Sequence, residues 1–146
     1  MVWCWLRLGF AVRLSTRIIK PKKKFNKKTA KKKMDALWSN LVRKRDTHCL
    51  VCGTTENLQA HHAIVTKAHS NATRWDTRNG VTLCYRCHIC KLHGSSDKVF
   101  LQEYLEKLNE KIPQDIQDDI RIKSNGIVKD SQTNLKMIED NLQDML

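Results

Sequence analysis

Hydrophobic residues recur at helical spacing in the segment that follows residue 34. Between residues 35 and 45, the apolar positions fall three or four residues apart on one stripe, formed by Leu37, Trp38, Leu41 and Val42. Asp35 is placed to cap the start of a helix, and basic residues end the segment, where the helix dipole favours cations. The pattern therefore predicts a helix over 35–45 whose stripe packs into a core.

The middle of the chain has the pattern of two strands followed by a helix. Residues 58–64 alternate between polar and apolar side chains, 80–84 form a short, mostly apolar run, and 85–92 have helical character. Because neighbours in a strand point to opposite faces, His61 and His62 belong to different faces of the first strand. We expect a bulge or bend at the end of this strand if both histidines serve one site.

Helical patterns return after residue 96. One helix begins at Ser96 or Asp97 and ends by Pro113, with an apolar face of Phe100, Leu101, Tyr104, Leu105 and Leu108. Ile116 and Ile120 indicate another short helix. In 128–146 the apolar spacing alternates between three and four residues, at Leu135, Ile138, Leu142 and Met145. This face either docks on the rest of the chain or forms a homodimer. The predicted fold class is α+β.

Charge divides the chain into three parts. The net charge is +12, and residues 1–33 carry +12, 34–95 carry +4 and 96–146 carry −4. We predict a disordered basic arm over 1–33, one folded domain over 34–95 and a helical C-terminal extension over 96–146. Translation starting at Met34 is an alternative. The basic arm favours nucleic acid as a partner, and a merely solubilising tail is the other interpretation.

Four of the six cysteines form two Cys-x-x-Cys pairs, Cys49 with Cys52 and Cys84 with Cys87. Two thiolates at this spacing can reach one tetrahedral zinc ion, so we predict a structural Zn²⁺ held by all four. The 31 residues between the pairs must be a structured excursion that returns to its start. Metal thiolates indicate a reducing, cytoplasmic location. The apolar opening is too short for a membrane span and lacks a signal cleavage site.

The segment between the cysteine pairs, together with the residues just after the second pair, resembles the motif of a known family. His61 and His62 on the first strand, Asn79 before the second, and His88 and His93 on the following helix resemble the HNH endonuclease motif. Small phage-encoded HNH proteins are similar in the leading Leu-Trp helix, the cysteine pairs and the run over 73–88. The resemblance covers about residues 37–93. It implies a small ββα-metal core with a zinc knuckle, flanked by helices, in a protein of phage or mobile-element origin.

The same resemblance implies a metal-dependent cleavage of DNA phosphodiester bonds. His61 and His88 would be ligands of a catalytic Mg²⁺, Mn²⁺, Ni²⁺ or Zn²⁺, His62 the general base, and Asn79 a brace between loop and strand. His93 follows His88 by five residues, which on a regular helix rotates it by about 140° and away from the metal. Coordination by His93 therefore requires the helix end to unwind before Gly94, and the alternative is that His93 contacts the phosphate.

Three basic residues of the intervening loop, Lys67, Arg74 and Arg78, are candidates to hold phosphates, with solvated surface charge as the alternative. Other functions share these residues. The histidines could extend a larger zinc knuckle in a noncatalytic module that binds nucleic acid. An RNase would use the same residues as a DNase, because nothing in the chain is specific to a 2′-hydroxyl.

Overall fold

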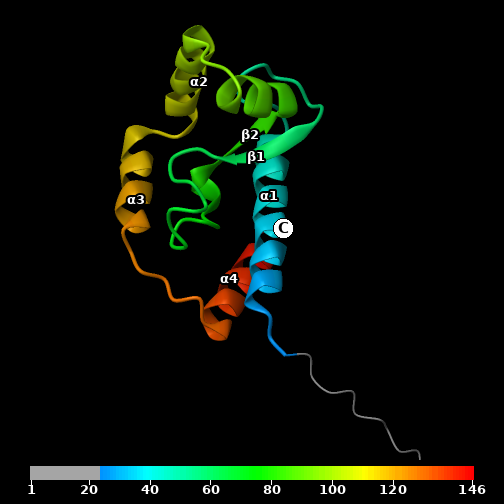
Figure 1. The fold of residues 1–146 in the computed structure, drawn as a ribbon, viewed down its shortest axis with the longest axis vertical. Helices are drawn as coiled ribbons and strands as arrows, with labels where there is room; N and C mark the ends of the chain where they lie inside the picture. The colour runs from blue at the N-terminus through cyan, green and yellow to red at the C-terminus, as the bar shows by residue number, and fades with distance from the viewer. Residues whose placement is uncertain (1–23) are drawn as a thin grey trace, which may run out of the picture.

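The computed structural model describes residues 24–146, in an α+β arrangement of one two-stranded sheet and surrounding helices (Figure 1). The N-terminal arm before residue 24 lies outside the described part. In chain order the elements are α1 (Lys27–Asp46), β1 (Leu58–His62), η1 (Thr77–Asn79), β2 (Gly80–Cys84), η2 (Arg86–His93), α2 (Lys98–Lys111), α3 (Gln114–Ser124) and α4 (Gln132–Asp144).

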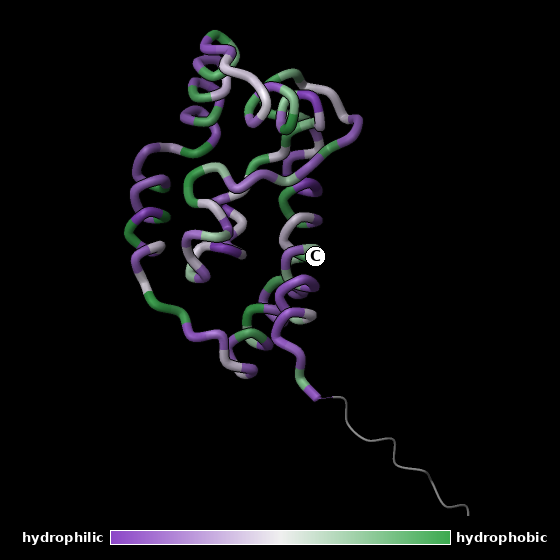
Figure 2. The backbone as a smooth tube through the Cα atoms, viewed as in Figure 1, coloured by the Kyte–Doolittle hydropathy of each residue, from purple (hydrophilic) through white to green (hydrophobic). Residues whose placement is uncertain are grey.

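Helix α1 is longer than its apolar stripe. The predicted cap at Asp35 is wrong, because the helix begins at Lys27, and the Asn26 side chain accepts hydrogen bonds from the Lys28 and Thr29 N–H groups at 3.0 and 3.2 Å. Residues 27–33, which the charge pattern places in a disordered arm, form the first two turns. A capping side chain and contacts with α4 offset the lysine repulsion. Figure 2 shows hydrophobic and hydrophilic positions alternating along α1.

The two strands pair antiparallel, with His61 opposite Val81 and His62 opposite Gly80. The register advances one residue at a time up to His62, so the bulge predicted at the end of the first strand is absent from the paired residues. Gly80 is required by close packing. A Cβ there would lie 2.6 Å from Val42 Cγ2 and 2.7 Å from Trp38 Cζ2, so α1 crosses directly over the end of the sheet.

Two hydrophobic clusters flank the sheet. One contains the stripe of α1 together with α4: Met34, Trp38, Leu41, Val42, Trp75, Leu135 and Leu142. The other joins β2 to α2 and contains three cysteines: Cys49, Val51, Val81, Leu83, Cys84, Cys87, Phe100, Tyr104, Leu108 and Ile112. The apolar face of α4 is therefore used inside the chain, beside α1 (Figure 1). Self-association through 128–146 stays a prediction.

The α2 helix buries three of the five residues of its predicted apolar face. Phe100, Tyr104 and Leu108 are buried, whereas Leu101 and Leu105 are 45% and 46% exposed.

Among the helices described, none combines the length and apolar character that a membrane span requires.

Candidate metal centres

The first centre is a cluster of four cysteines. Their Sγ atoms all lie within 4.8 Å of one another, and the Cys52 and Cys84 sulfurs are 3.7 Å apart. Tetrahedral zinc with bonds of about 2.3 Å separates its sulfur ligands by about 3.8 Å. The four thiols are free of disulfides, so their number and spacing fit one structural metal ion such as zinc.

Local structure brings the cysteines together from two places in the chain. Cys49 and Cys52 lie on a tight knuckle after α1, where Gly53 adopts a positive φ of 72° and its N–H donates to the Cys49 carbonyl at 2.9 Å. Cys84 ends β2 and Cys87 lies in the first turn of η2. The knuckle is joined to β2 because the Leu50 N–H donates to the Thr82 carbonyl at 2.8 Å.

The electrostatics of this cluster favour a bound cation. Burial would raise the pKa of Cys49, but hydrogen bonds from backbone N–H groups outweigh it and hold that pKa at about 7. Burial and the neighbouring Cys84 thiol raise the pKa of Cys87. Several thiolates this close repel one another, so their joint deprotonation requires a compensating positive charge.

The second centre is a cluster of three histidines. His61 on β1 meets His88 and His93 on η2, with ligand nitrogens all within 4.8 Å of one another. His61 Nδ1 and His88 Nε2 are 3.0 Å apart. Two imidazole ligands of a tetrahedral metal with bonds of about 2.0–2.1 Å would have nitrogens about 3.3 Å apart. The donor set and its spacing therefore fit one divalent cation.

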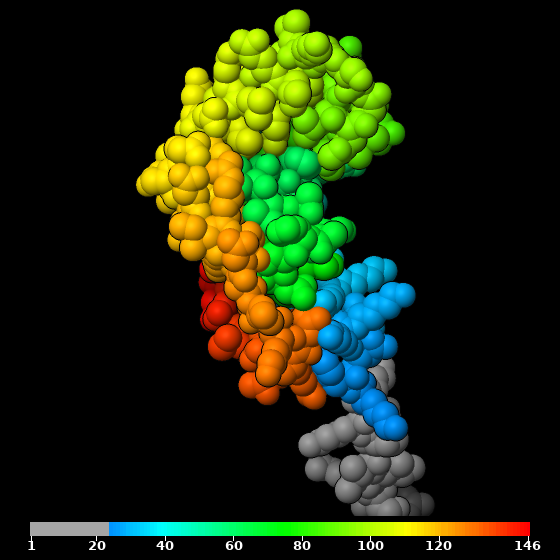
Figure 3. All heavy atoms as spheres, turned by 60° about the vertical axis from the view of Figure 1, so that its left-hand side comes forward, coloured from blue at the N-terminus to red at the C-terminus, as the bar shows by residue number. Residues whose placement is uncertain are grey.

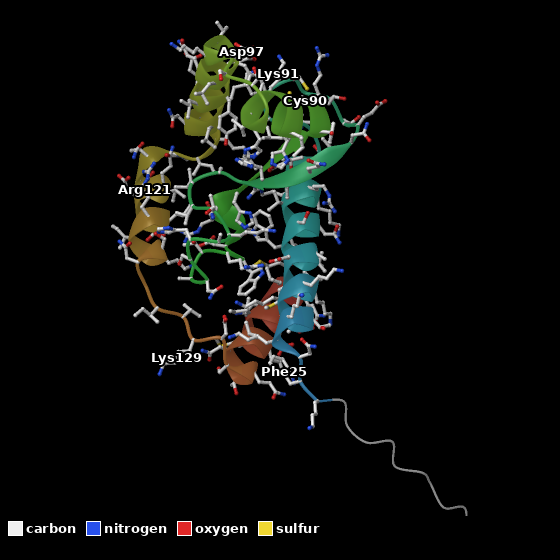
Figure 4. All side chains as sticks on the ribbon, viewed as in Figure 1. Phe25, Cys90, Lys91, Asp97, Arg121 and Lys129 are labelled. Carbon is white, nitrogen blue, oxygen red and sulfur yellow. The ribbon has the colours of Figure 1, made fainter. Side chains whose placement is uncertain are left out.

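The winding of η2 brings His93 to the cluster. This element is a π-helix, whose hydrogen bonds join residues five apart, so His88 and His93 share a face. The expectation that a five-residue separation turns His93 away is therefore wrong, because it assumed a regular α-helix. The wide last turn closes at Gly94, where a Cβ would lie 2.9 Å from the carbonyl oxygens of Ile89 and Cys90. Cys90 itself is exposed (Figure 4).

Gln59 orients one of these histidines, a role that the sequence pattern did not reveal. Its Oε1 accepts a hydrogen bond from His88 Nδ1 at 2.7 Å. With the proton on Nδ1, the lone pair of Nε2 points toward His61. Gln59 precedes His61 by two residues on β1, so strand alternation could have placed both side chains on one face.

Two of these imidazoles, His61 and His88, are suited to be neutral ligands. Burial, followed by the charges of His88 and His93, lowers the pKa of His61 to about 3. Burial, and then His93, also lowers the pKa of His88. Both rings are therefore neutral at pH 7, with lone pairs available to a metal.

His62 lies beside this cluster without joining it. Its ring stacks on Trp38 with 3.9 Å between ring centroids and 17° between planes, and Nε2 lies 2.9 Å from the Arg74 carbonyl oxygen. Because a carbonyl only accepts, Nε2 carries the proton and Nδ1 the lone pair. Burial lowers the pKa of His62 although the Arg74 carbonyl opposes the shift. A neutral, oriented imidazole can accept a proton near pH 7.

One cavity contains both kinds of histidine. Its volume is about 420 Å³, and its lining residues are Asp35, Trp38, Ser39, Ala60, His61, His62, Thr66, Lys67, His88 and His93. His62 ends β1, so its ring reaches the cavity without a bulge in the paired strand.

Asn79 is fully buried and ties the loop after β1 to β2. Its Oδ1 accepts from the Ile64 and Val65 N–H groups at 3.0 Å each, and its Nδ2 donates to the Val65 carbonyl at 2.7 Å. The amide thus bridges loop and strand. Because these bonds go to the loop backbone rather than to His62, any effect of Asn79 on that ring passes through the loop.

The three loop cations differ in their surroundings. Lys67 lines the histidine cavity, whereas Arg74 is held by Asp35 through contacts of 2.9 and 2.7 Å. Burial would raise the pKa of Asp35, but hydrogen bonding to Arg74 lowers it. Arg78 pairs with Asp76 and Asp119 and is not among the cavity's lining residues. Both arginines thus have carboxylate partners inside the chain.

Comparison with known proteins gave no match, whether to family models, to curated proteins or to solved structures. The chain's own geometry is therefore the guide to its function. That geometry is a four-cysteine cluster and a three-histidine cluster linked by η2, which contributes Cys87 to one and His88 and His93 to the other.

Proposed function

We propose that this protein is a metal-dependent endonuclease of the HNH type that hydrolyses DNA phosphodiester bonds. The observation that carries the proposal is the pairing, in one cavity, of a three-histidine cation site with a fourth histidine oriented as a base. Phosphodiester hydrolysis requires both of these groups, together with a rigid geometry between them. A purely structural zinc knuckle has no need of the fourth histidine.

The histidine cluster supplies the metal ligands in this proposal. His61, His88 and His93 would hold one divalent cation, and three protein ligands leave positions for water and phosphate. When bound, the cation supplies stabilisation of the negative charge that develops on the phosphate oxygens. Gln59 keeps the proton of His88 on the nitrogen remote from the cluster.

His62 is the proton acceptor. With Nε2–H donating to the Arg74 carbonyl, Nδ1 takes a proton from the attacking water. The stacked ring of Trp38 fixes the plane of the imidazole, and Trp38 is itself held by donating from Nε1 to the Asp76 carbonyl at 3.0 Å. Lys67, exposed at the cavity, balances the charge of the entering phosphate.

The four-cysteine site has a structural part in this arrangement. A zinc ion there would join the knuckle after α1, the end of β2 and the start of η2. The hairpin has only five residues in each strand, so it has little core of its own. The zinc site would thus keep β1 and η2 at the separation that the histidine cluster needs.

A plasmid-cleavage assay tests the proposal. Zinc-loaded protein is incubated with supercoiled DNA and Mg²⁺, Mn²⁺, Ni²⁺ or added Zn²⁺. The His62→Ala variant is expected to lose activity by about 10²–10⁴-fold, the usual contribution of a general base. The control is His69→Ala, which removes an exposed histidine of the same loop and is expected to cleave normally. Full activity of His62→Ala would exclude His62 as the base, and the products are expected to carry 5′-phosphates.

A noncatalytic nucleic-acid-binding module is the second candidate. The lysines exposed along the first half of α1 favour it, because they offer phosphate contacts that need no metal chemistry. It is distinguished by salt-dependent binding together with an absence of cleavage for every cation. Parallel reactions on RNA of the same sequence decide between a DNase and an RNase.

A further inference from the structure

A second depression adjoins the histidine cavity, and four of its eight lining residues are lysines. This lysine groove has a volume of about 740 Å³, and its lining residues are Asn26, Lys27, Lys28, Lys31, Lys32, Asp35, Arg74 and Asp130. Asp35 lines both the groove and the histidine cavity. The two depressions are therefore neighbours along α1. Phe25 and Lys129 mark this end of the molecule in Figure 4.

The four lysines of the groove fall into two groups. Lys27 and Lys31 are paired with Asp130 at 2.8 and 2.7 Å. Lys28 and Lys32 are exposed and have no carboxylate partner within residues 24–146. In Figure 3 the segment around residue 130 lies against the start of α1, as these ion pairs require.

The two unpaired lysines are spaced to follow a nucleic-acid backbone. Lys28 and Lys32 are four residues apart, so they share a face of α1 and are separated by about 6 Å along its axis. This separation is close to the rise of two nucleotides in one strand of duplex DNA, at about 3.4 Å each. From Lys28 to Trp38, which lines the histidine cavity, the helix rises about 15 Å, the length of about four nucleotides.

We propose that the lysine groove binds the phosphate backbone of the same DNA that enters the histidine cavity, on one side of the bond to be cleaved. Lys28 and Lys32 contact phosphates, while Asp130 withholds Lys27 and Lys31 and so limits affinity. The inference rests on the proposed nuclease function for the identity of the partner. It adds the path of the bound DNA, which runs along α1 from the cavity toward Asn26.

Binding by two matched variants tests the groove. In the full-length, zinc-loaded His62→Ala protein without added metal, fluorescence anisotropy measures the affinity for labelled duplex DNA across a salt series. Lys28→Gln/Lys32→Gln is expected to reduce the slope of log K against log salt by about 1.8 and to weaken binding by up to about 60-fold at 0.1 M salt. The control Lys98→Gln/Lys136→Gln removes the same charge from exposed lysines outside the groove.

A variant that is expected to strengthen DNA binding provides a second test. Asp130→Asn frees Lys27 and Lys31 while keeping the shape of the side chain, so the groove predicts tighter DNA binding and a steeper salt slope. Circular dichroism and thermal melting verify that every variant folds. Where Asp130→Asn does not fold, the lysine pair and its control decide alone.

The outcomes separate this proposal from the nuclease proposal. Equal losses of DNA affinity in the groove variant and the control would show general charge attraction and overturn the groove proposal. Cleavage by the parent protein with no loss of binding in Lys28→Gln/Lys32→Gln would also overturn the groove while the enzyme stands. If the groove variant loses DNA affinity as expected but the parent protein cleaves DNA with none of the tested cations, the groove proposal stands and the nuclease proposal is overturned.

Discussion

Two substitutions at Gln59 are expected to change metal affinity in opposite directions. Gln59 Oε1 accepts a hydrogen bond from His88 Nδ1 at 2.7 Å and so leaves the lone pair of Nε2 free to coordinate. Gln59→Leu keeps the volume of the side chain but removes the acceptor, which frees His88 to rotate or to change its tautomer. Gln59→Glu replaces the amide by a carboxylate, a stronger acceptor that makes the ring a better donor to a metal.

The magnitude follows from the role of the partner behind a metal-bound histidine. Loss of such a partner typically weakens metal binding by about 10–100-fold, or about 1.4–2.7 kcal/mol. We therefore expect Gln59→Leu to weaken cation binding by that factor and Gln59→Glu to strengthen it. The control is Gln102→Leu, because Gln102 is exposed on α2 and bonds only to Glu106 among the residues described.

Co²⁺ titration of zinc-loaded protein measures this effect, since its visible absorption reports the ligands around the ion. The four-cysteine site is kept filled with zinc, so that only the histidine cluster takes up cobalt. Equal cobalt affinities for Gln59→Leu, Gln59→Glu and the parent protein would refute the assignment of His88 Nε2 as a ligand.

Three further predictions concern the scaffold. Cys87→Ser, or zinc removal by a chelator, is expected to unfold the hairpin as seen by circular dichroism, whereas Cys90→Ser at an exposed position is not. Gly80→Ala places a methyl group 2.6 Å from Val42 and should lower the free energy of unfolding by about 1–3 kcal/mol in urea titrations; unchanged stability would contradict the packing of α1 on β2. Burial would raise the pKa of Asp76, but its bonds to basic side chains hold it at about 2 in the folded chain, below the unfolded value of 3.8. The ionised carboxylate therefore stabilises the fold above pH 4. Asp76→Asn should lower the free energy of unfolding by about 2 kcal/mol at pH 6 and by progressively less as the pH falls toward 2. A loss of stability that is independent of pH would show that the pairing is not electrostatic.

The residues of both candidate metal centres can be recognised in the amino-acid sequence. Each Cys-x-x-Cys spacing identifies a pair of thiolates that could share one ion, provided that the intervening chain returns to its start, and the fold brings all four together. The two strands, at 58–62 and 80–84, and the apolar stripe around Trp38 also lie where the hydrophobic pattern predicts them. These features depend on spacing over a few residues, where local geometry alone constrains the chain.

Other parts of the site depend on contacts between distant residues. Nothing in the sequence distinguishes Arg74, which Asp35 holds across 39 positions, from Lys67, which lines the cavity. The choice of ion pairs requires the packing of the loop on α1, which is decided by the whole fold.

The sequence by itself determined the residue types of the candidate ligands, the order of the elements and the positive charge of the N-terminal third. Only the tertiary structure decided that α1 begins at Lys27, that Gln59 lies behind His88, and that η2 winds as a π-helix and so turns His93 into the cluster. The physical reason is the same in each case. Alternative helix windings, helix ends and side-chain partners differ from one another by only small local free energies. Packing against residues far away in the chain therefore selects among them.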